Sequence, residues 1–521
     1  MDNTSEKPAL TPAKRAQFAI LSSAFAISIC GISYELLAGT ISSYFLGNAV
    51  LQYSLTIGLF LSAMGIGSYL SRKFEKNLLE SFLVIQILVG LTGGFSTFFL
   101  FMAYRFTMVF SLLFYLFLLF LGMLIGLEIP ILVRILKDYE ALKFSISDIL
   151  AFDYIGALLA SILFPLFILP HMGLMHASFF YALINMVVVF LNISVFSGIL
   201  KKKKAFLTAA FAVSAILFGG LIMSGKMVSF FESRLYEDEI IVTRQTKYQR
   251  IVVTNYAGDM RLYLDGNLQF SSWDEYRYHE ALVHPVMNLT ANRENVLILG
   301  GGDGLAAREV FKYPEVKKLT LVDLDPEMVD LCKTNFLISR LNCGSLSEPR
   351  MNLVYQDAYK FLETSQDRYG VIIVDLPDPN NEGLSKLYTV SFYRLIRHHL
   401  AKGGAVCVQS TSPYFARRTF WCVKHTIEKA GTGSEVGKDL YVKPYHLYVP
   451  SMGDWGFCLA SDRDFKPEDI RIKNISSKYI KEDVTPFFFF AKDEDEVPTE
   501  INTLNSHKLL YYYDQEWKKW E

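Results

Sequence analysis

The stretch NVLILGGGDGLAAREVFKYPEVKKLTLVDLDPEMVDLCKTNF, residues 295–336, decides the fold of the C-terminal half of this chain. An apolar run leads into a glycine-rich turn and a helical segment, and a second apolar run ends at Asp323. This order of strand, turn, helix and strand is a βαβ unit, whose strands lie parallel in one sheet. We therefore predict a Rossmann-like, doubly wound sheet, with further strands at Met351–Tyr355, Gly370–Val374 and Gly404–Gln409.

Glycines fill the turn between the first strand and its helix, at Gly300, Gly302 and Gly304. Glycine at such a turn lets a ligand approach the backbone closely. Asp323 follows Gly304 by 19 residues and ends the next strand, where a carboxylate can accept hydrogen bonds from ribose hydroxyls. The combination predicts a nucleoside site; the alternative is a tight structural turn followed by a helix-capping aspartate.

Asp303 stands inside the glycine-rich turn, where a dinucleotide would need room for its pyrophosphate. A carboxylate repels pyrophosphate, but it suits a sulfonium nucleotide that carries a free amine without a carboxylate beside it. Asp303 therefore argues against NAD and against ordinary S-adenosylmethionine as the ligand.

Three more acids follow predicted strands. Asp357, with Ala358 beside it in VYQDAYKF, can bond an adenine amino group, or can simply cap a helix. Asp375 and Asp378, in VIIVDLPDP, fall at the carboxyl end of a strand, where open α/β sheets bind ligands. Two carboxylates there can hold a diamine, and one can accept the proton that an attacking amine must lose. The alternative for this pair is a solvated Asp-Pro turn.

These segments together resemble the spermidine synthase family of aminopropyltransferases, from about Gln249 to Ala460. The matching segments are LDGNLQF, DEYRYHE, LILGGGDG, LVDLDPE, QDAYKF, DLPDP, LYTVSFY and GGAVCVQSTSPYF. Such enzymes transfer an aminopropyl group from decarboxylated S-adenosylmethionine to an amine such as putrescine and release methylthioadenosine. Their sheet is similar to that of class I S-adenosylmethionine-dependent methyltransferases. The whole chain resembles the bacterial members that carry an N-terminal membrane domain.

The resemblance implies a role for each donor-side residue. Asp303 would hold the aminopropyl nitrogen, Asp323 the ribose, and Asp357 the adenine. Gln249 would complete the donor site, with Gly300, Gly302, Gly304 and Ala358 lining it. Decarboxylated S-adenosylmethionine is then a co-substrate, and neither a cofactor nor a metal is expected.

On the acceptor side, the resemblance implies that Asp375 accepts the proton and that Asp378 is its partner at the amine. Tyr278, His279 and Gln409 would line the amine groove. Two departures from the family pattern fall on this side. The chain is one residue longer after DLPDP, and Pro450 stands where the family has a late tyrosine, for which Tyr448 is a candidate substitute. The identity of the acceptor amine therefore stays open.

Hydrophobic residues are concentrated before about residue 225. About seven segments there match the roughly 20 apolar residues that cross a bilayer. They are Ala16–Gly39, Val50–Leu70, Leu79–Ala103, Thr107–Leu132, Ile149–Leu169, Leu174–Val195 and Ala205–Gly225. We predict a tail (1–15), a transmembrane domain (16–225), a small antiparallel β-region with a linking helix (226–290), the Rossmann-like domain (291–475) and a C-terminal extension (476–521).

Lysine and arginine gather in alternate loops of the membrane half, as at Lys14–Arg15, Arg72–Lys76 and Lys201–Lys204. The positive-inside rule then predicts a multi-pass protein of the inner cell membrane with a cytoplasmic N-terminus. Seven crossings would put the C-terminal half on the other face, although the implied substrates are cytoplasmic, so the face of the enzyme domain stays open. Glu35, Glu128 and Asp153 lie in or near spans, either as a path for polyamines or cations or as acids paired inside the bundle.

Composition narrows the remaining classes. A net charge of −1 over 521 residues gives no support for a nucleic-acid partner. The six cysteines form no CxxC pair, so neither a metal site nor a disulfide framework is expected. The expected partners are the amine, the sulfonium nucleotide, the lipid bilayer and, from the resemblance, a second copy of the chain. Two rival functions are a membrane-tethered methyltransferase and a polyamine sensor or transporter.

Overall fold

The computed structural model describes residues 12–46, 49–104, 109–137, 146–236, 238–431, 440–517 and 519–520. The chain divides into two compact units, Met1–Glu237 and Asp238–Glu521. Most of the predicted tail (1–15) and the start of the span predicted from Thr107 lie outside the described residues.

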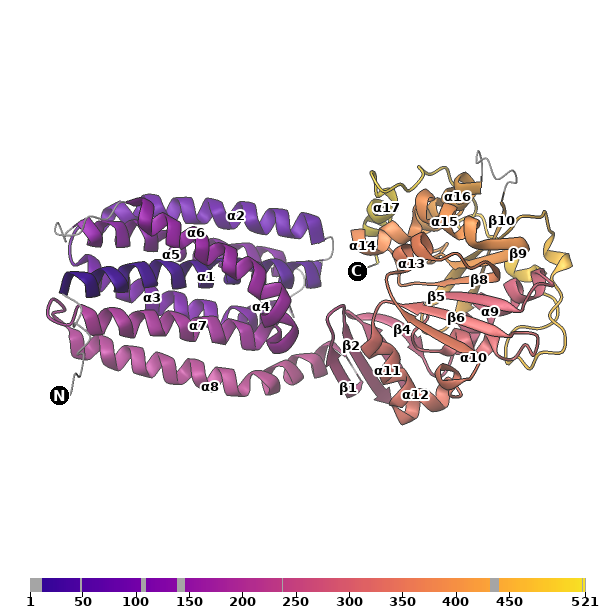
Figure 1. Ribbon diagram of the computed structural model, residues 1–521, viewed down its shortest axis with the longest axis horizontal. Coiled ribbons are helices and arrows are strands. Elements are labelled where there is room, and N and C mark those ends of the chain that lie inside the picture. Colours follow the sequence, from indigo (N-terminus) through magenta and orange to yellow (C-terminus); the bar gives the residue numbers. More distant parts are fainter. Residues whose placement is uncertain are drawn as a thin grey trace, which may run out of the picture. The chain divides into compact units, whose positions relative to one another are not determined.

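The first unit is a bundle of long helices (Figure 1). They are α1 (Pro12–Leu46), α2 (Ala49–Leu70), α3 (Leu78–Gly94), α4 (Ser96–Tyr104), α5 (Phe110–Lys137), α6 (Ile146–Leu163), α7 (Leu169–Val195) and α8 (Lys203–Leu235). Within the described residues, five helical segments are long and apolar enough to cross a membrane, and the bent pair α3 and α4 makes a sixth if it forms one span. The helix α8 continues past Gly225, the predicted end of the membrane domain, because no glycine or proline follows there to break it.

The number of candidate spans differs from the predicted seven because two of the predicted spans belong to one segment, Ile146–Val195, of 50 residues. This segment doubles back on itself. Ser28 of α1 donates to the main-chain oxygen of Asp153 in α6 (2.6 Å), and Cys30 of α1 donates to that of Tyr181 in α7 (3.4 Å). A straight helix would separate Asp153 from Tyr181 by about 42 Å, yet both lie at one level of α1. The backbone leaves helical geometry between them, at Gly173. Counting α6 and α7 separately restores seven, although seven crossings of a bilayer remain a prediction.

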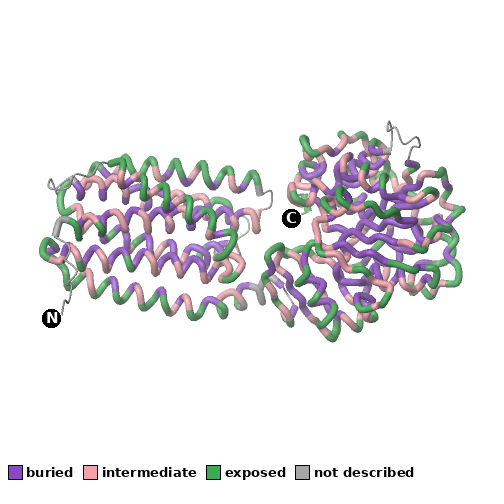
Figure 2. The backbone as a smooth tube through the Cα atoms, in the orientation of Figure 1, coloured by how far each residue is buried: buried purple, intermediate pink, exposed green. Residues whose placement is uncertain are grey.

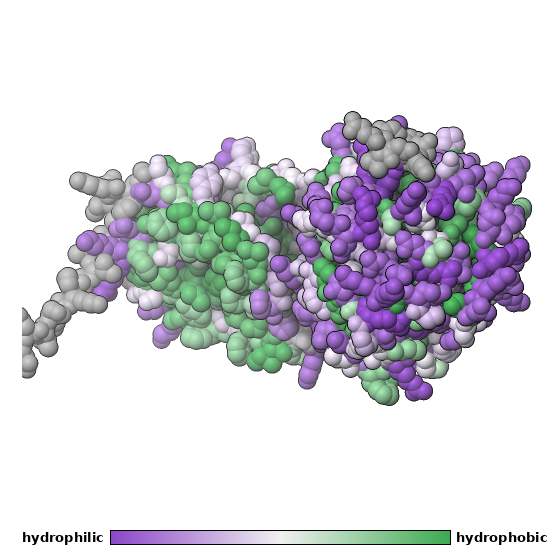
Figure 3. Space-filling view, turned by 45° about the vertical axis from the view of Figure 1, so that its right-hand side comes forward, coloured by the Kyte–Doolittle hydropathy of each residue, from purple (hydrophilic) through white to green (hydrophobic). Residues whose placement is uncertain are grey.

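The outer surface of this bundle is apolar. Leu61, Leu112, Leu158 and Ile222 are each more than half exposed, and Figure 3 shows hydrophobic side chains gathered over the helical unit. A water-soluble bundle would place polar side chains there. The exposed apolar surface therefore suits contact with lipid.

The second unit begins with a four-stranded antiparallel sheet, as predicted. Its strands are β1 (Glu239–Gln245), β2 (Arg250–Tyr256), β3 (Asp259–Leu264) and β4 (Asn267–Ser271). The tight turns at Ala257–Gly258 and Asp265–Gly266 have positive φ at both residues. That is the type I′ geometry that matches the twist of paired strands.

A seven-stranded sheet forms the rest of the unit, in the order β10-β11-β9-β8-β5-β6-β7. The strands are β5 (Asn295–Gly300), β6 (Lys318–Asp323), β7 (Met351–Tyr355), β8 (Tyr369–Asp375), β9 (Leu400–Gln409), β10 (Tyr441–Val449) and β11 (Gly453–Ser461). The first five are parallel and confirm the predicted Rossmann-like sheet, while β10 and β11 add an antiparallel edge. Figure 2 shows these central strands as the buried core.

Helices flank this sheet. They are α9 (Glu275–Leu289), α10 (Leu305–Val310), α11 (Pro326–Thr334), α12 (Phe336–Leu341), α13 (Ala358–Thr364), α14 (Glu382–Ser385), α15 (Val390–His399), α16 (Arg417–Gly431) and α17 (Lys508–Trp517). From β5 the chain proceeds to β6 and β7 on one side, and then returns to β8 on the other. Ligands bind at the carboxyl ends of strands where the order reverses in this way. The site is therefore expected beyond the ends of β5 and β8.

Candidate active site

The glycine-rich turn brings its neighbours unusually close to the backbone. A Cβ at Gly300 would come within 2.0 Å of the main-chain oxygen of Asp375, and one at Gly302 within 2.5 Å of Asp323 Oδ2. Gly300 and Gly304 also have φ of 85° and 80°, which other residues rarely adopt. The three glycines thus draw the ends of β5, β6 and β8 together.

Asp303 lies in this turn and is buried. Its Oδ1 accepts a hydrogen bond from the Leu305 backbone N–H (2.8 Å), and Asn342 holds its main-chain oxygen (2.8 Å). Within the described part of the chain, no hydrogen bond reaches Oδ2. Burial raises the pKa of Asp303, while the positive charge of His279 opposes that rise. The carboxylate is fixed in place with one oxygen left for a ligand.

Asp375 ends β8, and its Oδ1 accepts a hydrogen bond from the Tyr278 hydroxyl (2.8 Å). Burial raises the pKa of Asp375 to about 6, against the opposing influence of His279. Proton acceptors are most effective when their pKa lies near the working pH. Asp375 is therefore set to be ionised at neutral pH and still able to take up a proton.

Asp378 lies three residues further along the chain, in a cage of donors. Gln409 Nε2 (3.3 Å) and Thr411 Oγ1 (3.2 Å) donate to its carboxylate. Tyr513 of α17 also hydrogen-bonds it. Burial raises the pKa of Asp378 to about 6, and these hydrogen bonds limit the rise. These hydrogen bonds hold the Asp378 carboxylate in place beyond the carboxyl end of β8.

His279 places a positive charge close to these acids. Its Nδ1 contacts Glu275 Oε2 (2.9 Å), and Arg308 binds both oxygens of the same carboxylate (2.8 and 2.9 Å). Burial lowers the pKa of His279, but the bond to Glu275 outweighs burial and brings the pKa to about 9. A protonated His279 favours the ionised forms of Asp303 and Asp375.

Replacing His279 with glutamine should move the acidic limb of the pH–rate profile upward by about one pH unit, because the charge that lowers the pKa of Asp375 is lost. The measurement is kcat/KM for the amine between pH 5 and 9. His398→Gln, at an exposed position, is the matched control. An acidic limb that does not move would show that His279 does not tune Asp375.

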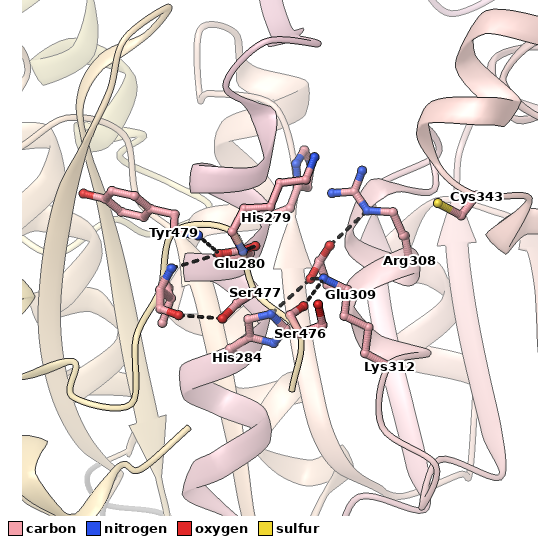
Figure 4. A network of polar contacts seen from close by, with 12 residues as sticks. His279, Glu280, His284, Arg308, Glu309, Lys312, Cys343, Ser476, Ser477 and Tyr479 are labelled. Carbon is pink, nitrogen blue, oxygen red and sulfur yellow. Dashed lines mark hydrogen bonds and ion pairs between the residues drawn. The ribbon is translucent and has the colours of Figure 1, made fainter. Parts of the chain in front are cut away.

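A polar network beside His279 ties the C-terminal extension to α9 (Figure 4). The Glu280 carboxylate accepts the backbone N–H groups of Lys478, Tyr479 and Ile480 (2.5–2.9 Å). Nearby, the Glu309 carboxylate contacts His284 (3.0 Å) and two cations, Arg308 (2.9 Å) and Lys312 (2.6 Å). Glu280, His284 and Glu309 lie close enough together to suggest a metal site. Because Arg308 and Lys312 already balance the charge of Glu309, and backbone N–H groups occupy Glu280, the cluster is better described as a network that holds α9 in place.

The donor-side residues meet around Asp325. Gln249 Nε2 donates to Asp325 Oδ2 (3.0 Å), and the Asp325 backbone N–H donates to Asp323 Oδ1 (2.9 Å). Burial raises the pKa of Asp323 to about 6. The structure thus brings Gln249, far away in the sequence, to the end of β6, while its contact with a donor remains a prediction.

Asp357 has a different environment. Its carboxylate caps α13 through the backbone N–H groups of Tyr359 and Lys360, and Lys386 Nζ binds its other oxygen (2.6 Å). Burial would raise the pKa of Asp357, but Lys386 and the backbone outweigh burial and lower it. The helix cap, the alternative considered from the sequence, is present, with Ala358 buried behind it. A contact from Asp357 to adenine remains a prediction.

Sequence reasoning did not assign Tyr388, Thr411 or Tyr513 to the site. Tyr388 OH donates to the main-chain oxygen of Pro377 (3.0 Å) and accepts a hydrogen bond from Gln409 (2.7 Å), which fixes the loop that carries Asp378. Tyr388 and Thr411 stand in the matched segments LYTVSFY and GGAVCVQSTSPYF, which were the available signal. Tyr513 lies in the extension, where no pattern pointed to the site.

Comparisons with known proteins find relatives along nearly the whole chain. The family model described as "Spermine/spermidine synthase domain" matches residues 275–467. The polyamine aminopropyltransferase of Leptospira interrogans is 42% identical over 510 residues, covering 96% of this chain and 99% of that protein. That of Oceanobacillus iheyensis is 42% identical over 502 residues, covering 95% and 96%. A crystal structure of spermidine synthase from Thermotoga maritima is 28% identical over 49% of this chain and 85% of that one, with a TM-score of 0.43.

A group of acids beyond the strand ends of a Rossmann-like sheet, together with this degree of full-length similarity, defines a transferase. The chain belongs to the polyamine aminopropyltransferase family, of the spermidine synthase type. The similarity extends through the N-terminal helical unit, because both relatives match nearly the whole chain. The family prediction from the sequence is confirmed.

Proposed function

We propose that this enzyme transfers the aminopropyl group of decarboxylated S-adenosylmethionine to a primary amine, with Asp375 as the proton acceptor. The observation that carries the proposal is the position of half-buried Asp375, with a pKa of about 6, near Asp303 at the ends of β8 and β5. The amine nitrogen attacks the methylene carbon beside the sulfonium. The carbon–sulfur bond breaks with its electron pair on sulfur, the new carbon–nitrogen bond forms, and the nitrogen loses a proton to Asp375.

Each acid of the site binds a different part of the two substrates. Asp303 Oδ2 binds the ammonium of the donor, and Asp323 binds its ribose. Asp378 holds the acceptor amine, whose nitrogen must be deprotonated because an alkylammonium has a pKa of about 10. The sulfonium charge disappears as the bond breaks, so the protein chiefly supplies position and proton acceptance.

Product mass spectrometry tests this proposal. The full-length protein in detergent is given decarboxylated or ordinary S-adenosylmethionine with a panel of diamines and polyamines. We expect methylthioadenosine and an amine heavier by one aminopropyl unit, from the decarboxylated donor alone. A methylated product with S-adenosylhomocysteine would instead make the chain a methyltransferase.

The C-terminal extension contributes to acceptor binding through Tyr513, because its hydrogen bond reaches Asp378. Tyr448, the substitute considered for the missing family tyrosine, is 58% exposed on β10. The Tyr513→Phe variant should raise KM for the amine by about tenfold, the worth of one hydrogen bond to a charged group. Steady-state kinetics against Tyr511→Phe, an exposed neighbour on α17, would test this; equal KM values for the two variants would contradict it.

We further propose that the helical unit crosses the inner membrane seven times, which puts the N-terminus and the enzyme unit on opposite faces. Cys343 offers a test, because it is the exposed cysteine of the enzyme unit whereas the other described cysteines are buried. A membrane-impermeant maleimide is applied to intact spheroplasts that carry either Cys343 or a cysteine placed in the N-terminal tail. We expect the reagent to label only one of these two cysteines, because they lie on opposite faces of the membrane. Labelling of both from one side would mean an even number of crossings.

A further inference from the structure

Four helices of the helical unit, Met1–Glu237, each contribute a buried polar side chain to one level of its apolar interior. These are Tyr34 (α1), Gln86 (α3), Glu128 (α5) and Asn185 (α7), none more than 1% exposed. Gln86 Nε2 donates to Glu128 Oε1 (2.7 Å). We call these four residues the polar layer.

The face of α3 shows that the polar layer is one place. Gln86, Gly90 and Gly93 lie on the same side of the helix, four and three residues apart. Gln86 meets Glu128, a Cβ at Gly90 would lie 3.7 Å from Asn185 Cβ, and one at Gly93 would lie 2.3 Å from the Tyr34 ring. The two glycines let α1 and α7 approach closely enough to bring their polar groups beside Glu128.

The polar layer contains an acid and no positively charged side chain. Gln86 Oε1, the Tyr34 hydroxyl and Asn185 Nδ2 are buried, and each lacks a hydrogen-bond partner within the described residues. No lysine, arginine or histidine of the described residues forms an ion pair with Glu128. Ionisable side chains inside a membrane bundle are costly and mark ligand pathways or are neutralised by a partner. An ionised Glu128 therefore calls for a positively charged partner, and the open Gln86 Oε1 can accept a hydrogen bond from it.

We propose that the polar layer is a binding site for a protonated alkylamine, separate from the catalytic site. An ammonium group brings three N–H donors, which match Glu128, Gln86 Oε1 and the Tyr34 hydroxyl. The Tyr34 and Tyr181 rings, whose centroids lie 6.5 Å apart in a T-shaped arrangement, add aromatic carbon beside these polar groups. A hard divalent ion would require more oxygen ligands than the polar layer provides. The site stands on residues of the membrane unit alone and does not depend on the reaction proposed above.

Equilibrium binding of radiolabelled 1,4-diaminobutane tests this site in the full-length protein in detergent. The Asp375→Asn, Asp378→Asn background removes amine binding by the enzyme unit. We expect the double variant to bind one equivalent of 1,4-diaminobutane per chain in a saturable manner. Adding Glu128→Gln to the double variant should weaken this binding at least tenfold. Glu35→Gln makes the same change in a buried acid of α1 and should leave binding unchanged. Aminopropyl transfer by the single Glu128→Gln variant, with its catalytic acids intact, shows that this variant is folded.

Two outcomes would overturn the proposal: no saturable binding in the double-variant background, or binding that survives Glu128→Gln. Infrared difference spectroscopy adds a third. If wild-type protein shows a protonated-carboxyl band that Glu128→Gln removes and that the diamine does not alter, Glu128 is a neutral hydrogen-bond donor and the layer binds no amine.

Discussion

The Asp375→Asn variant should lose kcat by about 10²–10⁴-fold, the usual contribution of a positioned proton acceptor. Asparagine keeps the size of the side chain and an oxygen that can accept the hydrogen bond from Tyr278, so the site should keep its shape. It cannot accept the proton that the attacking amine must release. Donor affinity should therefore change little, and the loss should appear in turnover, measured as methylthioadenosine formed at saturating substrate.

The pH profile adds a second readout for Asp375. The pKa of its carboxyl is about 6, above the ordinary value, so the acceptor is ionised above pH 6 and is progressively protonated below it. Wild-type activity should fall as the pH drops through about 6, and the residual activity of the variant should lack that dependence on Asp375. Asp367→Asn, on the exposed surface near Lys318, is the control. A variant within tenfold of wild type would remove Asp375 from its role.

The sequence predicted those features that depend on short-range pattern. The apolar strands, the glycine turn and the acids at strand ends each follow from a few neighbouring residues, and the parallel sheet then places them together. Asp357 shows the limit of such reasoning. A carboxylate after a strand can cap the next helix or face a ligand, and only the position of Lys386, far along the chain, shows that its second oxygen is occupied.

The contacts made by the C-terminal extension were not predicted. Tyr513 reaches Asp378 across more than a hundred residues, and Glu280 holds the backbone of Lys478–Ile480. The extension shows no periodicity that would announce either contact, because its role is set by where it docks. Prediction of the N-terminal helical unit has the same limit. Hydropathy shows how long an apolar segment is, but it does not show that the chain reverses at Gly173.

Replacing Asp303 with asparagine should weaken binding of decarboxylated S-adenosylmethionine by about 10²–10³-fold. In the proposed mechanism, the ammonium of the donor binds the buried carboxylate of Asp303, which the Leu305 N–H already holds in place. Removing one partner of a buried ion pair costs about 3–5 kcal/mol, because the other charge is left without compensation. Calorimetric binding of the donor, without an acceptor present, measures this loss apart from turnover.

Asp303 should also decide which donor the enzyme accepts. Ordinary S-adenosylmethionine carries a carboxylate beside the amine that Asp303 would hold, and two carboxylates in a buried site repel each other. The Asp303→Asn variant should therefore lose affinity for the decarboxylated donor and, at the same time, lose discrimination against the ordinary one. Asp330→Asn, on the exposed side of α11, should change neither affinity. A variant that binds both donors more weakly by the same factor would mean that Asp303 only supports the turn, and the selectivity would then have to arise elsewhere in the donor site.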